Sequence, residues 1–150
     1  MINLKNRVKK IKINEKKLIQ DAQRILDILD YADFDLGILL TSNVAIRKFN
    51  RDFREKDKPT DILSFPFYPD LRPPERIEAL SSEEKNLGDL ILSLEYIEKD
   101  AQKWDQTLEQ RLRVLLVHGI CHLLGYDHID DKDYTVMQAQ EDEILRQLKG

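Results

Sequence analysis

All three histidines of the chain lie in one stretch of eleven residues, HGICHLLGYDH, at 118–128. His118 and His122 are four residues apart, so on a helix they project from the same face. Gly125 suits the left-handed residue that ends a helix and reverses the chain, and His128 follows three residues later. The spacing therefore predicts that three imidazoles converge on one point.

Three imidazoles with an open fourth position are typical of a catalytic zinc site, in which water completes the tetrahedron. We predict that His118, His122 and His128 bind one Zn²⁺ ion. The alternative is three unrelated histidines, each satisfied by ordinary hydrogen bonds. That alternative leaves two matched intervals and a suitably placed glycine unexplained, and imidazoles are costly to bury in so apolar a helix without a partner. A site of three histidines would also accept nickel or copper.

The spacing H-x-x-x-H-x-x-G-x-x-H is that of the metzincin proteases, which carry a glutamate general base directly after the first histidine. Gly119 occupies that position here. No carboxylate can act from it, so the pattern argues against peptide hydrolysis. A zinc hydrolase of another substrate stays open.

Three more residues near the histidines could serve either the site or the fold. Asp127 could bond a ligating imidazole or accept a proton, but we favour a helix cap for the segment that follows. Cys121 points roughly 100° around the helix from His122, so we interpret it as a core residue rather than a fourth ligand. We also assign Met137 to the core rather than to a floor beneath the metal.

The elements that position these residues follow from hydrophobic periodicity. Thr107 and Gln110 have capping-box spacing, which predicts that a largely buried helix begins there and carries His118 and His122. Helical spacing predicts further helices at 15–30, about 43–49, 94–103 and 131–148.

Short apolar runs predict strands at 34–41, 61–67 and 87–95, and the prolines predict a long surface loop at 68–86. Asp61 and Asp89 lie beside these strands and are interpreted as turn or cap residues. No element is assigned to residues 1–14. The fold class is α+β, a three-to-four-stranded mixed sheet packed with helices, with the metal site on a buried C-terminal helix. A chain of 150 residues predicts a single domain, 1–150.

Composition limits the class of protein. The longest aliphatic run is VLLV at 114–117, far short of a membrane span, and the N-terminus lacks the apolar region of a secretory signal. A single cysteine excludes an intrachain disulfide and fits a reducing compartment. We predict a soluble, cytoplasmic protein. The segment 5–17 carries seven Lys/Arg and one Glu. On charge alone a solvated face is favoured over a phosphate-binding patch.

HGICHLLGYDH closely resembles the signature of the YbeY family of bacterial metal-dependent endoribonucleases linked to rRNA maturation. FNRDFREKDKPTDILSFPF at 49–67 resembles the central block of that family, and LGDLILS at 87–93 resembles its L-G-D-I-x-I-S strand. The blocks occur in the family's order and together span about residues 43–145. The positions that match in the central block are Arg54, Asp57, Thr60, Asp61, Ser64 and Phe65.

The resemblance implies an α+β fold, a zinc ion held by His118, His122 and His128, and cleavage of single-stranded RNA. It also implies work on the 3′ end of 16S rRNA and in ribosome quality control, with the small ribosomal subunit as partner. The functional arginine of the family maps to Arg54. We expect Arg54 and His118 to be the catalytic residues.

The chemistry of the Arg54 side chain also supports phosphate binding, because a guanidinium is planar, permanently charged and able to donate two parallel hydrogen bonds to phosphate. The alternative role for Arg54 is a surface ion pair with Glu55 or Asp57. No histidine is left over as general base, so either a water molecule or the RNA 2′-OH could be the nucleophile.

Two other functions stay open beside the zinc-dependent endoribonuclease. One is a ribosome assembly factor whose zinc is mainly structural. The other is a metzincin-like zinc hydrolase of another substrate. The basic segment 5–17 fits the nuclease and the assembly factor equally well.

Overall fold

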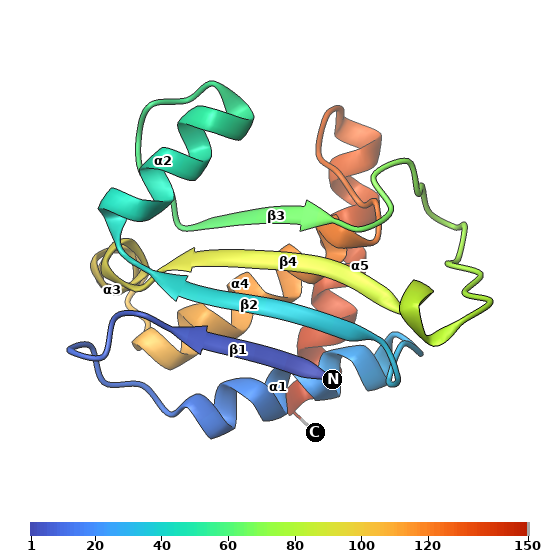
Figure 1. Cartoon of the computed structure of the whole chain (residues 1–150), viewed down its shortest axis with the longest axis horizontal. Coiled ribbons are helices and arrows are strands. Elements are labelled where there is room, and N and C mark those ends of the chain that lie inside the picture. Colours follow the sequence, from blue (N-terminus) through green and yellow to red (C-terminus); the bar gives the residue numbers. More distant parts are fainter. Residues whose placement is uncertain (150) are drawn as a thin grey trace.

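A computed structural model describes residues 1–149, which form one four-stranded sheet and the helices that cover it (Figure 1). The elements follow in the order β1 (Ile2–Asn6), α1 (Glu15–Ile28), β2 (Asp35–Thr41), α2 (Asn43–Arg54), β3 (Ile62–Pro66), η1 (Ser82–Glu84), β4 (Asn86–Ser93), α3 (Leu94–Lys103), α4 (Leu108–Leu123) and α5 (Asp131–Lys149).

The strand order in the sheet is β1-β2-β4-β3. β1 and β4 both run parallel to β2, whereas β3 is antiparallel to β4 at the far edge. The predicted mixed sheet and α+β class are therefore confirmed. The edge strand β1 was not predicted, because INLKN offers only two apolar residues and becomes a strand by pairing with β2.

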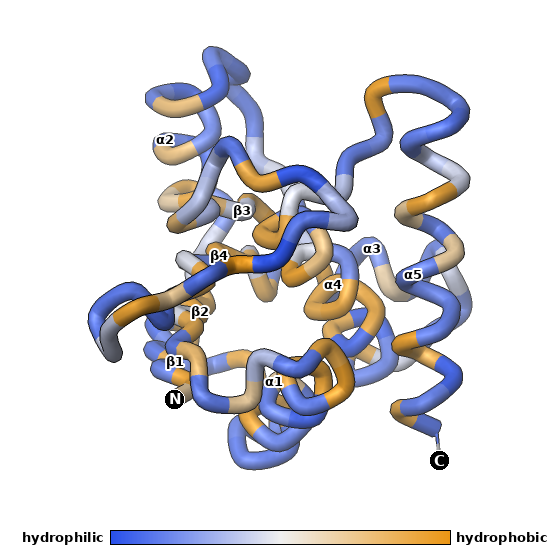
Figure 2. The backbone as a smooth tube through the Cα atoms, turned by 90° about the vertical axis from the view of Figure 1, so that its right-hand side faces the viewer, coloured by the Kyte–Doolittle hydropathy of each residue, from blue (hydrophilic) through white to orange (hydrophobic). Residues whose placement is uncertain are grey.

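Period-two alternation gives the sheet two different faces. Leu36, Ile38 and Leu40 of β2 point into the main core, which α1 and α4 close from the other side. In Figure 2, orange, apolar segments occur along β2, β4 and α4, and α4 lies opposite these strands. The opposite face carries a smaller cluster in which Leu63 and Ile91 pack against α2.

Helix α4 lies between the sheet and α5 and carries the histidine pair. Its predicted capping box is present: the Gln110 amide donates to Thr107 Oγ1 at 3.1 Å, and the Thr107 amide donates to Gln110 Oε1 at 2.9 Å. Gly119 brings α4 close to the sheet, since a Cβ there would lie 2.7 Å from Ile62 Cδ1 and 2.9 Å from Leu90 Cδ2.

Helix α2 is longer than predicted. It was expected to end at Phe49 but continues to Arg54, and Glu55 closes it in the left-handed region with φ 58°. The reason is tertiary: Asn50 is buried, and its Nδ2 donates to the carbonyl of Lys58 at 2.9 Å, which holds the last turn against the chain that follows.

The predicted loop 68–86 is irregular apart from the short η1 and the first residue of β4. Within residues 1–149 we find no helix with the length and apolar content required to cross a membrane.

Candidate metal centre

The histidine pair occupies the last turns of α4, and the chain reverses directly after it. Gly125 has φ +93°, and a Cβ at this position would collide with the carbonyl oxygen of Leu71. Only glycine fits this turn without strain. The turn returns His128 towards the helix, as the spacing predicts.

The three imidazoles gather at one point. The Nε2 atoms of His118 and His122 are 3.1 Å apart, and the two ring centroids are separated by 4.5 Å. The ring of His128 lies 5.2 Å from that of His122 and 6.0 Å from that of His118. A tetrahedral zinc with Zn–N distances of about 2.0–2.1 Å would hold two nitrogens about 3.3–3.4 Å apart, so the spacing of the pair suits such an ion.

The outer nitrogens of the pair are held by acceptors. His118 Nδ1 donates to Glu141 Oε2 at 3.1 Å, and His122 Nδ1 donates to the carbonyl of Tyr126 at 2.9 Å. Because a carboxylate and a carbonyl can only accept, both Nε2 atoms keep a free lone pair. Hydrogen bonds of this kind fix the tautomer and the ring orientation of histidines that bind metals.

Burial and the neighbouring His118 lower the pKa of His122 below its ordinary value of 6.5. The ring of His122 is therefore neutral at neutral pH, which is the form that a metal ligand requires.

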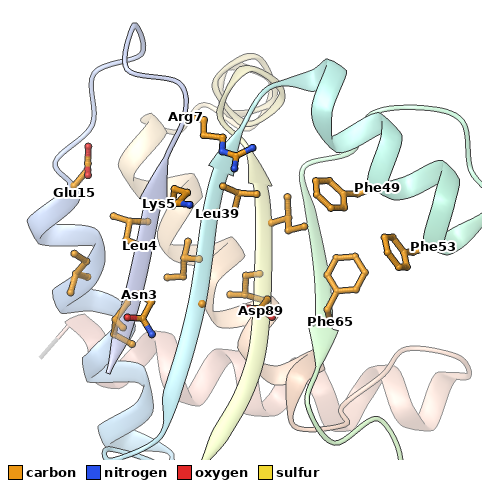
Figure 3. A pocket seen from close by; sticks show the side chains of 16 residues that line it. Asn3, Leu4, Lys5, Arg7, Glu15, Leu39, Phe49, Phe53, Phe65 and Asp89 are labelled. Carbon is orange, nitrogen blue, oxygen red and sulfur yellow. The ribbon is translucent and has the colours of Figure 1, made fainter.

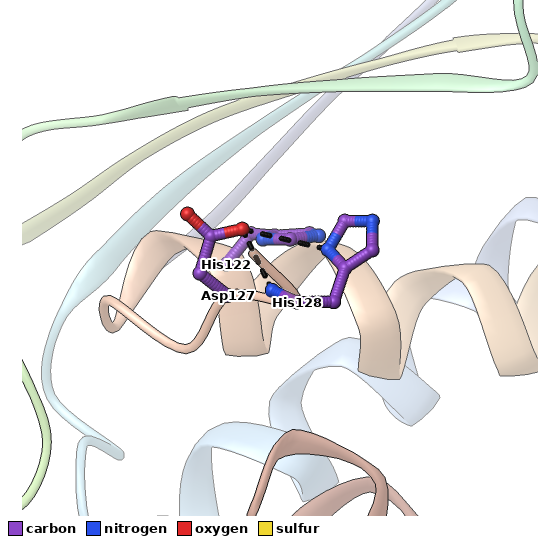
Figure 4. A group of neighbouring side chains, drawn as sticks. All are labelled: His122, Asp127 and His128. Atoms are coloured by element: carbon purple, nitrogen blue, oxygen red, sulfur yellow. Dashed lines mark hydrogen bonds and ion pairs between the residues drawn. The ribbon is translucent and has the colours of Figure 1, made fainter. Parts of the chain in front are cut away.

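Asp127 lies at the same point. Its Oδ1 accepts from the backbone amide of His128 at 2.7 Å and lies 3.4 Å from His128 Nδ1 (Figure 4). His122, Asp127 and His128 each offer a ligand atom, and these atoms all lie within 4.8 Å of one another, so this cluster could hold a metal ion. His118 does not belong to this group, although its Nε2 lies 3.1 Å from that of His122. The interpretation of Asp127 as a helix cap is wrong, because the amide of Asp133 in α5 donates to Asp130 Oδ1 at 2.8 Å.

Cys121 and Met137 lie in the main core, as interpreted from the sequence. Burial raises the pKa of the Cys121 thiol to about 12, so the thiol stays protonated. A metal ligand would have to be the thiolate.

The histidines open into a cleft of about 440 Å³ whose opposite wall is β3. Arg54, at the end of α2, lines the same cleft together with Asp61 and Asp127. Arg54 has no ion-pair partner among residues 1–149, and Asp57 pairs instead with Arg47 at 2.8 Å. The alternative that Arg54 forms an ion pair with Glu55 or Asp57 is therefore wrong.

Asp61 and Asp89 lie on opposite sides of the sheet. Asp61 Oδ1 accepts from the amide of Ile62 at 2.7 Å, as expected of a turn residue, although its side chain also lines the histidine cleft. Asp89 faces a cavity of about 810 Å³ on the far side of the sheet (Figure 3). The interpretation of Asp89 as a turn or cap residue is wrong, because it lies within β4 and pairs with Phe65 of β3.

Glu141 was missed in the sequence, although α5 contains a signal for it. Met137, Ile144 and Leu148 form the buried stripe of the helix, and Glu141 falls within that stripe. Its side chain is only 13% exposed. A carboxylate inside an apolar stripe requires a buried partner, and here the partner is His118.

An open cleft lined by histidines, carboxylates and an arginine is the arrangement of a metal-dependent hydrolase. The family model described as Endoribonuclease YbeY matches residues 3–149. The chain therefore belongs to the YbeY endoribonuclease family, and the resemblance drawn from the motifs is confirmed.

Individual relatives agree with the family model. The Endoribonuclease YbeY of Sulfurihydrogenibium sp. is 39% identical over 135 residues, which cover 89% of this chain and 83% of the relative. The Endoribonuclease YbeY of Syntrophotalea carbinolica is 35% identical over 151 residues, which cover 99% of this chain and 96% of the relative. The solution structure of a Thermotoga maritima protein shares the fold, with a TM-score of 0.57 at 24% identity over 99% of this chain and 92% of that one.

Proposed function

We propose that this protein is a zinc-dependent endoribonuclease that cleaves single-stranded RNA. Its proposed work is the maturation of the 3′ end of 16S rRNA and ribosome quality control, in the cytoplasm and with the small ribosomal subunit as partner, carried out by residues 1–150 as one domain. The observation that carries the proposal is a single cleft that combines the three histidines with Arg54, in a chain of an endoribonuclease family.

The metal part of the proposal assigns one Zn²⁺ to His118, His122 and His128, with water in the fourth position. The converging Nε2 atoms of the helical pair and their outer hydrogen bonds support this assignment. When bound, the ion would lower the pKa of water and offset negative charge on phosphate oxygens.

The other catalytic role falls to Arg54, whose guanidinium would bind the non-bridging oxygens of the scissile phosphate. Charge that develops there in the transition state would be stabilised by a donor already in place. His118 would contribute to catalysis as a metal ligand, and Glu141 would orient its ring. The chain has no further histidine to act as general base. The product ends separate the two nucleophiles: 5′-phosphate ends exclude the RNA 2′-OH, and 2′,3′-cyclic phosphate ends exclude water.

A second candidate function is an assembly factor with a structural zinc, and the position of Asp127 favours it. Structural zinc sites fill the fourth position with a protein ligand. Asp127 lies close enough to His122 and His128 to supply one.

Peptide hydrolysis has no such support. The position that carries the metzincin glutamate is Gly119, which packs against Ile62 and Leu90 of the sheet. A side chain at that position would enter the core instead of the cleft.

The test is cleavage of a labelled single-stranded RNA by the purified protein, with His122→Ala prepared in parallel. Cutting by the wild type alone assigns the activity to the metal site. Equal cutting by both proteins identifies a contaminating ribonuclease. If neither cuts, with zinc bound stoichiometrically, the assembly factor becomes the better proposal, and co-sedimentation with small subunits then tests it.

A further inference from the structure

A second, smaller cavity adjoins the histidines on the side away from Arg54. It has a volume of about 270 Å³ and lies between α4 and α5. His118, His128 and Asp61 line both this cavity and the cleft that contains Arg54. Any polymer bound across the histidines would therefore meet a cavity on each side of the metal centre.

Two large aromatic side chains line this second cavity and are largely exposed. Trp104 closes the C-terminus of α3 and is 61% exposed, and Tyr134 in the first turns of α5 is 55% exposed. Neither side chain is needed to fill the core. Exposed aromatic rings beside a nucleic-acid site serve as stacking platforms for unpaired bases.

The rest of the lining suits a planar base. Leu115 and Met137 supply an apolar floor, and Gln138 adds an amide. The Arg111 guanidinium lies 5.1 Å from the centroid of the Trp104 ring, and its Nη2 lies 3.6 Å from Asp100 Oδ2.

We propose that this cavity binds one nucleobase of the single-stranded RNA substrate, next to the scissile phosphate. The base stacks on Trp104, while Tyr134 and Gln138 border it from α5. The volume lies below the roughly 300–1,000 Å³ of ordinary ligand pockets, which suits one base rather than a longer segment. The inference rests on the proposed endoribonuclease function for its substrate class. It also gives a physical reason for single-strand specificity, because a paired base cannot enter.

Trp104 is the only tryptophan of the chain, so its fluorescence reports on this cavity alone. The zinc-loaded full-length protein is mixed rapidly with a short single-stranded RNA, with excitation beyond the absorption of the bases, and the emission is followed before cleavage proceeds. We expect saturable quenching by the single strand and none by a duplex of the same sequence. Unchanged emission at RNA concentrations that saturate cleavage would overturn the proposal, and so would quenching by a short peptide but not by RNA.

Variants give the second arm. Trp104→Ala should raise KM for single-stranded RNA about tenfold, within the range for loss of one base–aromatic stack, with kcat and zinc content unchanged. Trp104→Phe should restore most of the affinity, because it keeps a stacking ring. Tyr96→Ala is the matched control, an exposed aromatic on α3 that does not line the cavity.

These experiments distinguish a failure of the base-binding cavity from a failure of the proposed endoribonuclease function. Cleavage with an unaltered KM in Trp104→Ala refutes the base-binding cavity and leaves the nuclease in place. Saturable quenching by RNA without cleavage supports the cavity and refutes the nuclease.

Discussion

The two faces of the sheet carry cavities of opposite character. The larger, about 810 Å³, lies on the face that α2 only partly covers, and it is lined mainly by aliphatic residues and by Phe49, Phe53 and Phe65 (Figure 3). The histidine cleft on the other side measures about 440 Å³. Only the smaller one brings several histidines and carboxylates together with Arg54, which has no ion-pair partner within residues 1–149. Convergent titratable groups therefore identify the site better than size does.

The largest effect is expected from the third histidine. His128→Ala should remove zinc and reduce RNA cleavage to background, because two imidazoles alone bind zinc weakly. Metal content by atomic absorption and cleavage of a labelled RNA measure both effects. Phe53→Ala, in the larger cavity, should change neither, and a loss of cleavage in that variant would place the active site on the opposite face of the sheet.

Arg54 should follow in size. Arg54→Ala is expected to lower kcat by about 10²–10³-fold, the range for loss of one donor to a transition-state oxyanion, with zinc content and melting temperature unchanged. Arg51→Ala is the control from the same helix, since Arg51 pairs with Asp52 and does not line the cleft. Equal activity of both variants with the wild type would remove Arg54 from the mechanism.

The third prediction concerns the hydrogen bond between Glu141 and His118 Nδ1. Glu141→Gln leaves an acceptor of the same shape but without charge, so zinc affinity should fall about 10–100-fold. Competition with a chromophoric chelator measures the change. Glu143→Gln alters an exposed glutamate two residues away that pairs with Arg146, and it should bind zinc as the wild type does. Matching affinities in the two variants would argue against support of His118 by Glu141.

Gly119 should give the smallest effect, and that effect is on stability. Gly119→Ala places a methyl against Ile62 and Leu90 in the core, so the free energy of unfolding should fall by about 1–3 kcal/mol, as for other overpacked sites. Gly37→Ala on the opposite face is the control. There the new methyl meets the exposed end of Asp89, which can rotate away at lower cost. Denaturant unfolding measures the free energy of unfolding of both variants. A larger loss in Gly37→Ala than in Gly119→Ala would contradict the tight packing of Gly119 against the sheet.

Local patterns in the sequence are enough to predict the parts of the molecule that depend on short spacings. The interval between His118 and His122 fixes a common helical face, and Gly125 fixes the turn, because few residues lie between them and backbone geometry leaves little freedom. The capping box at Thr107, three of the four strands and the family resemblance followed from local patterns in the same way.

Residues that are distant in the sequence come together at the site through the packing of whole helices and strands. Glu141 reaches His118 because α5 packs on α4, and Arg54 reaches the cleft because α2 continues five residues beyond its predicted end. β1 becomes a strand only by pairing with β2, and the cavity beside Trp104 exists only between two packed helices. Spacing along the chain constrains neighbours, whereas contacts across tens of residues depend on how whole elements pack, which no local pattern encodes.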